Sequence, residues 1–375
     1  MNNILKTIMY AFTFMSLISG HRAFAQTSAR ISQNAAYYSN SFYNYNQLPD
    51  IYNNIGINIQ HIVIHEVVQS RFYYDGNVSM FKEFSDRFNH YHEIGYDGII
   101  SYSKNNHTFY FGSSLGRNLD KGYYTLYDNR KIDFYSNFKY YLRENLIARS
   151  GYVYTNRIYD NLSEFTYGEH QLFVRLNTYF QSGTSLSFYL NYGLKNYKQT
   201  NPDNVVHPST DQLILYAKTA QSLGAKTSIS FSYLNRSKPG FAQGQTNVIN
   251  NEYLFSGDEL FDDRYGYSGH ELMINLIYYL PHNIKSEFNI GTIWKNYHNR
   301  LIFDEYGDVI MNEGTTRHDF RYSGWLSISR GFMVGRLIQS ANAYLTVGYL
   351  KNHSNDVYYD FNNIYTSIGI EFKIE

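Results

Sequence analysis

IYTSIGIEFKIE, residues 364–375, ends the chain, and its side chains alternate in kind at every position. One set is apolar or neutral and consists of Ile364, Thr366, Ile368, Ile370, Phe372 and Ile374. The other set consists of Tyr365, Ser367, Gly369, Glu371, Lys373 and Glu375. A period of two places the two sets on opposite faces of a β-strand. Because a strand at the end of a sheet leaves an unpaired edge, we expect it to pair with the chain's own first strand and close a barrel.

The same residues resemble the C-terminal strand signal of Gram-negative outer-membrane β-barrels. That signal has a polar residue, a glycine two positions on, and two hydrophobic residues separated by one position; here these are Ser367, Gly369, Phe372 and Ile374. Such proteins usually end on an aromatic residue, whereas this chain ends Ile374-Glu375. The resemblance implies that outer-membrane lipid surrounds the protein and that its C-terminal strand is read by the barrel-assembly machinery.

The first 25 residues have the pattern of a secretory signal peptide. A lysine at position 6 precedes an apolar run from about Ile8 to Ile18, and Ala23-Phe24-Ala25 offers a small-x-small cleavage site before Gln26. This pattern predicts removal of residues 1–25. A membrane anchor is less favoured, because the run is too short for a hydrocarbon layer of ~30 Å.

The composition also favours a membrane barrel. The chain has 41 Tyr and 26 Phe, yet its mean hydropathy is −0.45. Alternation of lipid-facing and lumenal residues keeps such an average polar, while aromatic residues gather at the two membrane interfaces. This Tyr- and Asn-rich composition resembles that of barrels from the Bacteroidota. The absence of cysteine excludes disulfides, and 32 basic against 32 acidic residues give no sign of nucleic-acid binding.

From about Ile94 onward the sequence predicts successive hairpins, in segments of ~10–13 alternating residues. The expected pairs are 94–104 with 107–117, 130–142 with 145–157, 168–181 with 184–196, 211–221 with 224–236, 269–280 with 284–296, and 317–330 with 338–351, followed by a last strand at 362–374. Short turns separate the members of each pair, and long connections lie near 118–129, 158–167, 197–210, 237–268, 297–316 and 352–361. Short periplasmic turns and long extracellular loops are typical of bacterial barrels.

These thirteen segments need an odd number of further strands, because single-chain bacterial barrels normally have an even number. Arg71 to Glu83 supplies one, 55–59 alternates too, and 37–45 alternates weakly. We therefore predict an all-β, antiparallel up-and-down transmembrane barrel of about 14 strands, with 16 as the alternative. It forms one domain, 26–375, in which 26–50 is an exposed or partly lumenal segment and the barrel starts near 55 or 70.

Charged residues recur on the predicted lumenal faces. The candidate pore-lining residues are Lys131, Lys139, Arg149, Arg175, Lys195, Lys218, Glu271, Glu287, Lys295, Asp319 and Arg321, to which Asp133, Glu371 and Lys373 add further charge. Such residues can simply pair across strands and hydrate the interior. They can also form a polar pore whose field selects ions or small solutes. Basic residues outnumber acidic ones in this set, which favours a weak preference for anions.

Three other groups invite a chemical interpretation. His61, His65, His90 and His92 have spacings compatible with metal ligation, but no acidic helper accompanies them. Asp258, Glu259, Asp262 and Asp263 form an acidic run without the regular ligand spacing of a calcium loop. A hydrolase would need a nucleophile near His and a carboxylate, and no spacing links Ser101, Ser113, Ser329, His318 and Asp319. We predict no metal, no cofactor and no catalytic residue.

The leading hypothesis is a porin-like outer-membrane channel for passive passage of ions or small solutes. A second is a non-conducting surface or assembly barrel that binds a partner through its outer loops, and a lower one is an outer-membrane hydrolase. A transporter of hydrophobic compounds is less favoured still, because 26–50 is short and polar for a plug. The connection at 237–268 is long enough either to constrict the lumen or to cap the surface. The cargo and the oligomeric state do not follow from the residues.

Overall fold

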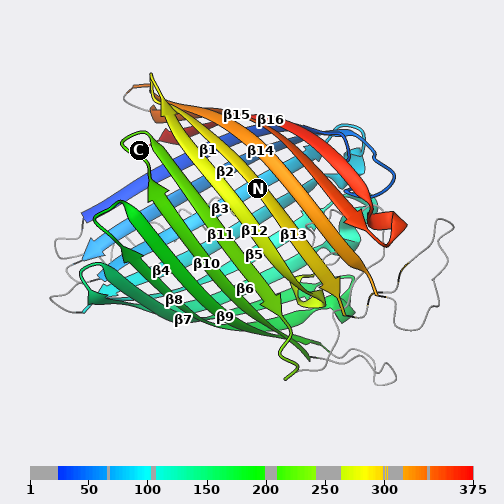
Figure 1. Cartoon of the computed structure of the whole chain (residues 1–375), viewed down its shortest axis with the longest axis horizontal. Coiled ribbons are helices and arrows are strands. Elements are labelled where there is room, and N and C mark those ends of the chain that lie inside the picture. The colour runs from blue at the N-terminus through cyan, green and yellow to red at the C-terminus, as the bar shows by residue number, and fades with distance from the viewer. Residues whose placement is uncertain are drawn as a thin grey trace, which may run out of the picture.

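The computed structural model describes residues 24–65, 68–102, 107–198, 209–241, 263–298, 300, 302, 316–335 and 338–374. Sixteen antiparallel strands form one closed barrel, in which each strand pairs with its neighbours in the sequence and β1 pairs with β16 (Figure 1). The fold class is therefore as predicted, and the strand number is the alternative of 16; the preferred number of 14 was two strands short. The strands are β1 Phe24–Tyr38, β2 Asp50–His65, β3 Val68–Phe81, β4 Asn89–Ser101, β5 Thr108–Asp120, β6 Asn129–Arg143, β7 Leu146–Tyr159, β8 Tyr167–Tyr179, β9 Thr184–Tyr197, β10 Ser209–Ser222, β11 Thr227–Ser237, β12 Tyr267–Leu280, β13 Ile284–Tyr297, β14 His318–Met333, β15 Ile338–Ser354 and β16 Phe361–Ile374.

The two missing strands lie at the start of the barrel. Residues 26–38 are part of β1, and the barrel does not begin near 55 or 70 as predicted. The segment 37–45, which alternates weakly in sequence, is mostly a connection and contains Tyr43 with a positive φ of 55°. Strand β1 escaped detection because Ala29, Gln33 and Ala35 lie on its outward face, so that its two faces differ little in polarity. The predicted signal-peptide cleavage after Ala25 falls at the start of this strand and stays a prediction; residues 1–23 lie outside the described part of the chain.

The final strand closes the barrel as its sequence predicts. It pairs with β1 from Ala29 opposite Ile374 to Tyr38 opposite Tyr365, and with β15 on its other side. Gly369 of the assembly signal faces inward beneath the ring of Tyr344, where a Cβ would lie 2.3 Å from Tyr344 Cζ. That glycine therefore has a structural role, because the ring of the neighbouring strand occupies its place.

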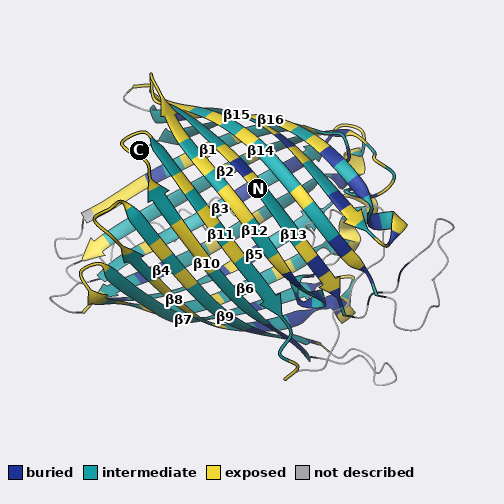
Figure 2. Ribbon diagram, viewed as in Figure 1, coloured by how far each residue is buried: buried dark blue, intermediate teal, exposed yellow. Residues whose placement is uncertain are grey.

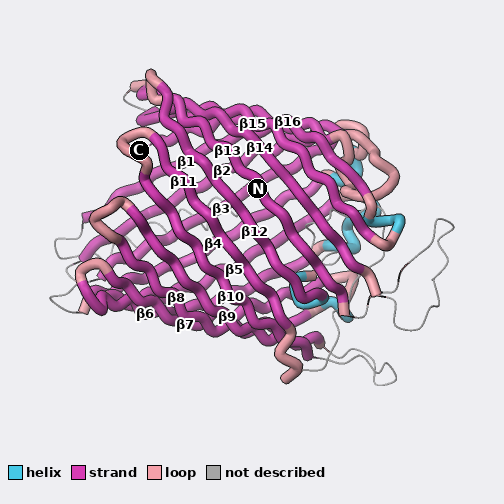
Figure 3. Tube along the Cα trace, in the orientation of Figure 1, coloured by secondary structure: helices cyan, strands magenta, loops and turns pink. Residues whose placement is uncertain are grey.

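The connections differ in length at the two ends of the barrel. The predicted turns at 143–144, 182–183, 223–224 and 281–283 are short in the structure, while 105–106 lie outside the described residues. All the long connections lie at the other end, which also holds five short 3-10 helices (Figure 3). They are η1 Ser85–Arg87, η2 Gly122–Tyr127, η3 Ser163–Phe165, η4 Arg264–Gly266 and η5 Val357–Tyr359. We call the two ends the short-turn end and the long-loop end.

The outward surface carries the large apolar side chains. Ile94, Leu172 and Ile368 are 54%, 59% and 63% exposed, and on most strands such residues alternate with largely polar residues that face inward. Exposed and partly buried residues alternate along the strands, whereas fully buried residues gather at the long-loop end (Figure 2). This arrangement suits a wall with hydrocarbon outside and water inside. Among the described residues, the structure contains no helix long and apolar enough to cross a membrane.

Candidate functional site

The strand register places every predicted pore-lining residue on the inward face. In β6, for example, Lys131 and Lys139 alternate with Phe134, which is 51% exposed on the outer surface. The same alternation holds for the other members, which are Arg149, Arg175, Lys195, Lys218, Glu271, Glu287, Lys295, Asp319 and Arg321. Sequence periodicity could predict this much, because a one-residue shift in register exchanges the two faces.

Several of these inward charges form ion pairs. Lys131 Nζ lies 2.7 Å from Asp133 Oδ2, and Arg236 Nε lies 3.0 Å from Glu271 Oε1. Glu287 accepts from Lys285 at 2.5 Å, and Arg317 pairs with Asp319 through two hydrogen bonds. These paired residues need no role in selecting solutes, because their charges neutralise each other and hydrate the wall.

Three inward cations are arranged differently. Lys139, Arg149 and Arg175 lie directly opposite one another on the adjacent strands β6, β7 and β8. Among the described residues none of the three has an ion pair with a carboxylate. We call these three residues the basic row. Like charges directly opposite on neighbouring strands are destabilising, so the stability of the sheet does not explain this placement.

Each member of the basic row contacts a tyrosine ring. Lys139 Nζ lies 4.6 Å from the ring centre of Tyr141 and 2.7 Å from its hydroxyl. The Cζ atoms of Arg149 and Arg175 lie 4.9 and 5.0 Å from the ring centres of Tyr110 and Tyr189. A cation above an aromatic face is held in place without losing its charge. The row is thus a fixed cationic patch on the wall, nearer the short-turn end.

The sequence analysis missed an acidic group on the strands next to this wall. Asp97 on β4 pairs with Arg71 and accepts a hydrogen bond of 2.6 Å from Tyr135. Glu93, on the same face of β4, accepts from Tyr73 at 3.1 Å. The face alternation of β4 could have identified both carboxylates: Asp97 lies within the predicted strand 94–104, and Glu93 directly precedes it. The inward face is therefore less basic than the predicted set suggested.

A segment from the longest connection enters the barrel at the long-loop end. We call Asp263–Gly266, which consists of η4 and its N-cap, the η4 segment. Lys195 Nζ lies 2.5 Å from Asp263 Oδ2, with both side chains only 1% exposed, and Tyr197 donates to the same oxygen at 2.9 Å. The segment thereby reaches β9 across the inner face of β10 and β11. Of the predicted acidic run, Asp258, Glu259 and Asp262 lie outside the described residues.

A second contact ties the η4 segment to β8. Glu169, which is 4% exposed, accepts a hydrogen bond of 2.6 Å from the Tyr265 hydroxyl and pairs with Arg264. Burial, followed by the charge of Glu169, raises the pKa of Tyr265, so that its phenol stays protonated and remains a donor. Sequence alone could not predict either contact, because the pairs are separated by up to 96 positions.

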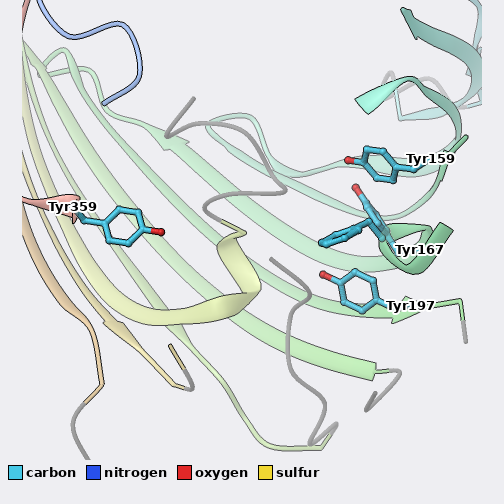
Figure 4. Packing of buried hydrophobic residues seen from close by; sticks show 5 residues of the cluster. Tyr159, Tyr167, Tyr197 and Tyr359 are labelled. Carbon is cyan, nitrogen blue, oxygen red and sulfur yellow. The ribbon is translucent and has the colours of Figure 1, made fainter. Parts of the chain in front are cut away.

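Tyrosine side chains fill much of the remaining space at this end. Tyr159, Tyr167 and Tyr197 are buried on neighbouring strands, and Tyr359 of η5 extends toward them from the facing side (Figure 4). Tyr359 also stacks on Arg317, whose Cζ lies 3.3 Å from its ring centre. The lumen is therefore narrowed by side chains and connections at its long-loop end.

The β1–β2 connection belongs to the same closure. Arg87, only 3% exposed, stacks on Phe42 and Phe81 at 4.2 and 4.1 Å. Asn40 is fully buried and donates its side-chain amide to the carbonyl oxygens of Asn44 and Asn362. This connection is consequently a packed element, joined to the strands on both sides of the seam between β1 and β16.

The other candidate groups are not brought together. His61 and His65 lie at the short-turn end, whereas His90 and His92 lie at the long-loop end. No group of three or more potential metal ligands exists among the described residues. His318 and Asp319 are adjacent in β14 and so face opposite sides of the wall; Asp319 pairs with Arg317. Ser101, Ser113 and Ser329 lie on three different strands, none of them within hydrogen-bond reach of this histidine in the described contacts.

No family model and no curated protein matches the chain. Solved structures from Gram-negative bacteria do resemble it. OccK5 (OpdH) of Pseudomonas aeruginosa matches with a TM-score of 0.52 and 11% identity, over 93% of this chain and 98% of that one. OccAB1 of Acinetobacter baumannii matches at 0.51 and 12%, over 94% and 97%. The outer membrane protein OpdK of P. aeruginosa matches at 0.51 and 8%, over 93% and 99%.

At these identities the likeness concerns the fold. The chain has the closed-barrel fold of Gram-negative outer-membrane proteins, as its C-terminal strand predicted. The compositional resemblance to barrels of the Bacteroidota stays a prediction.

Proposed function

We infer that the protein is an outer-membrane channel through which small anionic solutes or ions pass passively. Barrels of 16–18 strands are wide enough to enclose an aqueous channel, whereas barrels of about eight strands are filled by side chains. The inward face carries most of the polar and charged strand residues, and most of the large exposed apolar residues face outward. Short turns at one end and long connections at the other support an orientation with the short-turn end in the periplasm.

The observation that carries the proposal is the basic row. Three adjacent cations with no carboxylate partner among the described residues raise the local concentration of anions. The tyrosine rings beneath them limit their mobility without neutralising them. An anion that enters from either end would exchange part of its hydration shell for these donors, as in other charged pores. The chemical class of cargo that fits is therefore a small solute with at least one negative charge.

The η4 segment and the tyrosine cluster support a constriction at the long-loop end. Their contacts are buried and include the ion pair between Lys195 and Asp263. This arrangement favours the constricting alternative over a surface cap for the described end of the 237–268 connection. The same closure is the observation that favours the second candidate function, a non-conducting barrel that binds a partner through its outer loops.

Planar bilayers distinguish the two functions. The channel proposal expects stepwise conductance and a reversal potential that indicates anion preference; no conductance over many insertions would favour the non-conducting barrel. Replacing Arg149 and Arg175 by glutamine should lower the anion-to-cation permeability ratio by roughly fivefold per charge, since one charge at contact distance in water is worth about 1 kcal/mol. Alanine at Arg175 or Arg321 should shift selectivity in the same direction.

Two matched controls keep the test specific. Arg175→Lys retains the charge and should preserve most of the preference. Arg130→Gln removes a cation from the outer surface, where it pairs with Asp160 at 3.0 Å, and should change nothing. If R149Q/R175Q and R130Q have the same selectivity as the unmodified protein, the basic row does not select ions.

Recognition of the C-terminal strand by the barrel-assembly machinery, through Ser367, Gly369, Phe372 and Ile374, is a further proposal. It is supported by the position of these residues on the strand that closes the barrel.

A further inference from the structure

The histidines of the strands gather on one part of the outer surface. Six of them lie in the last four positions of their strands at the long-loop end: His90, His92, His170, His270, His318 and His353. All six alternate with inward residues and share their face with exposed apolar side chains. Only His61 and His65 lie on strands at the opposite end of the described barrel. The distribution is therefore uneven, and the channel function does not require it.

A repeated contact joins three of these histidines to tyrosines. The hydroxyl groups of Tyr74, Tyr152 and Tyr233 lie 2.7, 2.6 and 2.7 Å from Nδ1 of His92, His170 and His270. In each case the tyrosine is on the preceding strand, two residues further from the long-loop end than the residue opposite the histidine. Tyr322 and His353 repeat this diagonal, with ring centres 5.8 Å apart. We call these four pairs the Tyr–His belt.

The contact determines which imidazole nitrogen is available. At His270 the side-chain amide nitrogen of Asn235 also lies 3.2 Å from Nδ1. An amide nitrogen is a donor, so Nδ1 accepts and the proton resides on Nε2. Among the described residues, no side chain forms a hydrogen bond with Nε2 of His170 or of His270. Nε2 of His270 is therefore a donor on the outer surface, near the long-loop end, where an aromatic belt would meet lipid headgroups.

The surroundings of His92 add positive charge. Arg117 of β5 lies directly opposite it, and Nδ1 of His90 lies 2.9 Å from its Nε2. Arg117 shares Asp160 with Arg130, at 2.6 and 3.0 Å. Two guanidinium groups thus face one carboxylate, which leaves this sector cationic even when the histidines are neutral.

The other pairs have fewer charged neighbours. His170 faces Tyr152 and Tyr154 on one side and Leu194 on the other. His270 lies between Asn235 and Trp294. His353 lies 3.7 Å from Asp360, which also pairs with Lys351. Within the described part of the chain, no carboxylate forms an ion pair with His170 or His270, so that protonation would add charge there.

We propose that the Tyr–His belt binds the phosphate groups of anionic lipids in the leaflet at the long-loop end. Phosphate oxygens accept hydrogen bonds from imidazole and guanidinium groups, and the belt presents both beside rings that suit the acyl boundary. Protonation gives an imidazole a positive charge, so binding should strengthen as the pH is lowered. The proposal requires only that the barrel lies in a membrane, and it is independent of the channel function.

The two tryptophans of the chain provide a local probe. Trp294 lies directly opposite His270 on the outer surface, and Trp325 faces inward. In a Trp325→Phe background, quenching of Trp294 by brominated lipids reports which lipid occupies the belt. Phosphatidylglycerol, which is anionic, is compared with phosphatidylcholine, which is neutral overall. We expect phosphatidylglycerol to be preferred, and by roughly fivefold more at about pH 5.5 than at about pH 8, because one added charge near an anionic headgroup is worth about 1 kcal/mol.

The variants separate the belt from general membrane electrostatics. His270→Gln should remove the pH-dependent part of the preference at Trp294. Tyr233→Phe keeps the ring but removes the hydroxyl contact with Nδ1, to which Asn235 still donates, and should weaken the preference. The control His61→Gln/His65→Gln removes two outward histidines at the other end and should leave Trp294 quenching unchanged. Equal quenching by the two lipids at both pH values would overturn the proposal, and so would an equal loss in the control variant. Heat-modifiable migration on gels verifies that each variant is folded.

Discussion

Replacing Lys195 by methionine tests whether the η4 segment constricts the channel. Lys195 and Asp263 are each 1% exposed and 2.5 Å apart, so the change leaves a carboxylate buried without its cation. Removing one partner of a buried pair typically costs about 3–5 kcal/mol. Asp263 would retain the hydroxyl of Tyr197 and the backbone amide of Tyr265 at 2.9 and 3.0 Å, which offset part of this loss.

The remaining cost can be relieved if the η4 segment leaves the wall and Asp263 reaches water. Since every 1.4 kcal/mol changes an equilibrium tenfold, a loss of about 3 kcal/mol raises the released population by roughly a hundredfold. We expect single-channel conductance to increase in planar bilayers. We also expect faster tryptic cleavage after Arg264, which the contact with Glu169 holds against the wall in the unmodified protein.

A double variant and a surface control make this prediction refutable. Lys195→Met combined with Asp263→Asn removes the buried charge and keeps an acceptor for Tyr197, so conductance and cleavage should return most of the way to the original values. Lys82→Met breaks an ion pair whose side chains are 64% and 57% exposed, a class worth about 0–1 kcal/mol, and should have no effect. If K195M has unchanged conductance and unchanged cleavage at Arg264, the η4 segment is not a constriction held by this ion pair.

Two further predictions concern the wall. Gly95→Ala should destabilise the barrel by about 1–3 kcal/mol, as overpacking does, because the added Cβ would lie 2.2 Å from Cζ of Tyr73. The added Cβ of Gly331→Ala meets nothing within 4 Å, so this control should be nearly neutral. Urea titration of the folded form on gels measures the difference in stability between the two variants. Ile368→Arg should lower the stability of the barrel by about 2–4 kcal/mol, since this side chain is 63% exposed on the outer face in the middle of β16. Ser367→Arg, on the inner face, should lower it much less. Equal losses of stability in the two variants would refute the assignment of faces.

The position of a strand could be predicted where its two faces differ clearly in polarity. Strands β8 and β12 alternate strongly, with Leu172 and Ile274 outward, and their positions were predicted to within two residues. Strand β1 could not be predicted in this way, because Ala29 and Ala35 on its outer face give little contrast with its polar inner face. Its partner provides the missing hydrophobic contrast, since Ile368 lies opposite Ala35.

The candidate site divides along the same line. The inward direction of Arg149 and Arg175 follows from the period of two alone, and so does their inclusion among the predicted pore-lining residues. Their direct opposition does not follow, because register depends on the turns between β6, β7 and β8. The ion pair between Asp263 and Lys195 is harder still to predict, since it joins a connection to a strand 68 positions away in the sequence. Local pattern thus determines which way a side chain faces, and tertiary structure determines whether its charge is neutralised.

That distinction carries the functional argument. A count of inward charges treats Lys131 and Arg175 alike, yet the first lies 2.7 Å from Asp133 and the second has a tyrosine ring as its neighbour. Opposed cations on adjacent strands reduce the stability of the sheet, and a neutral pair such as Ser or Thr at these positions would avoid that loss. A wall that only needed hydration would be served as well by such residues. The basic row is therefore the feature on which the proposal of an anion-preferring channel rests, and a selectivity measurement on R149Q/R175Q tests that proposal directly.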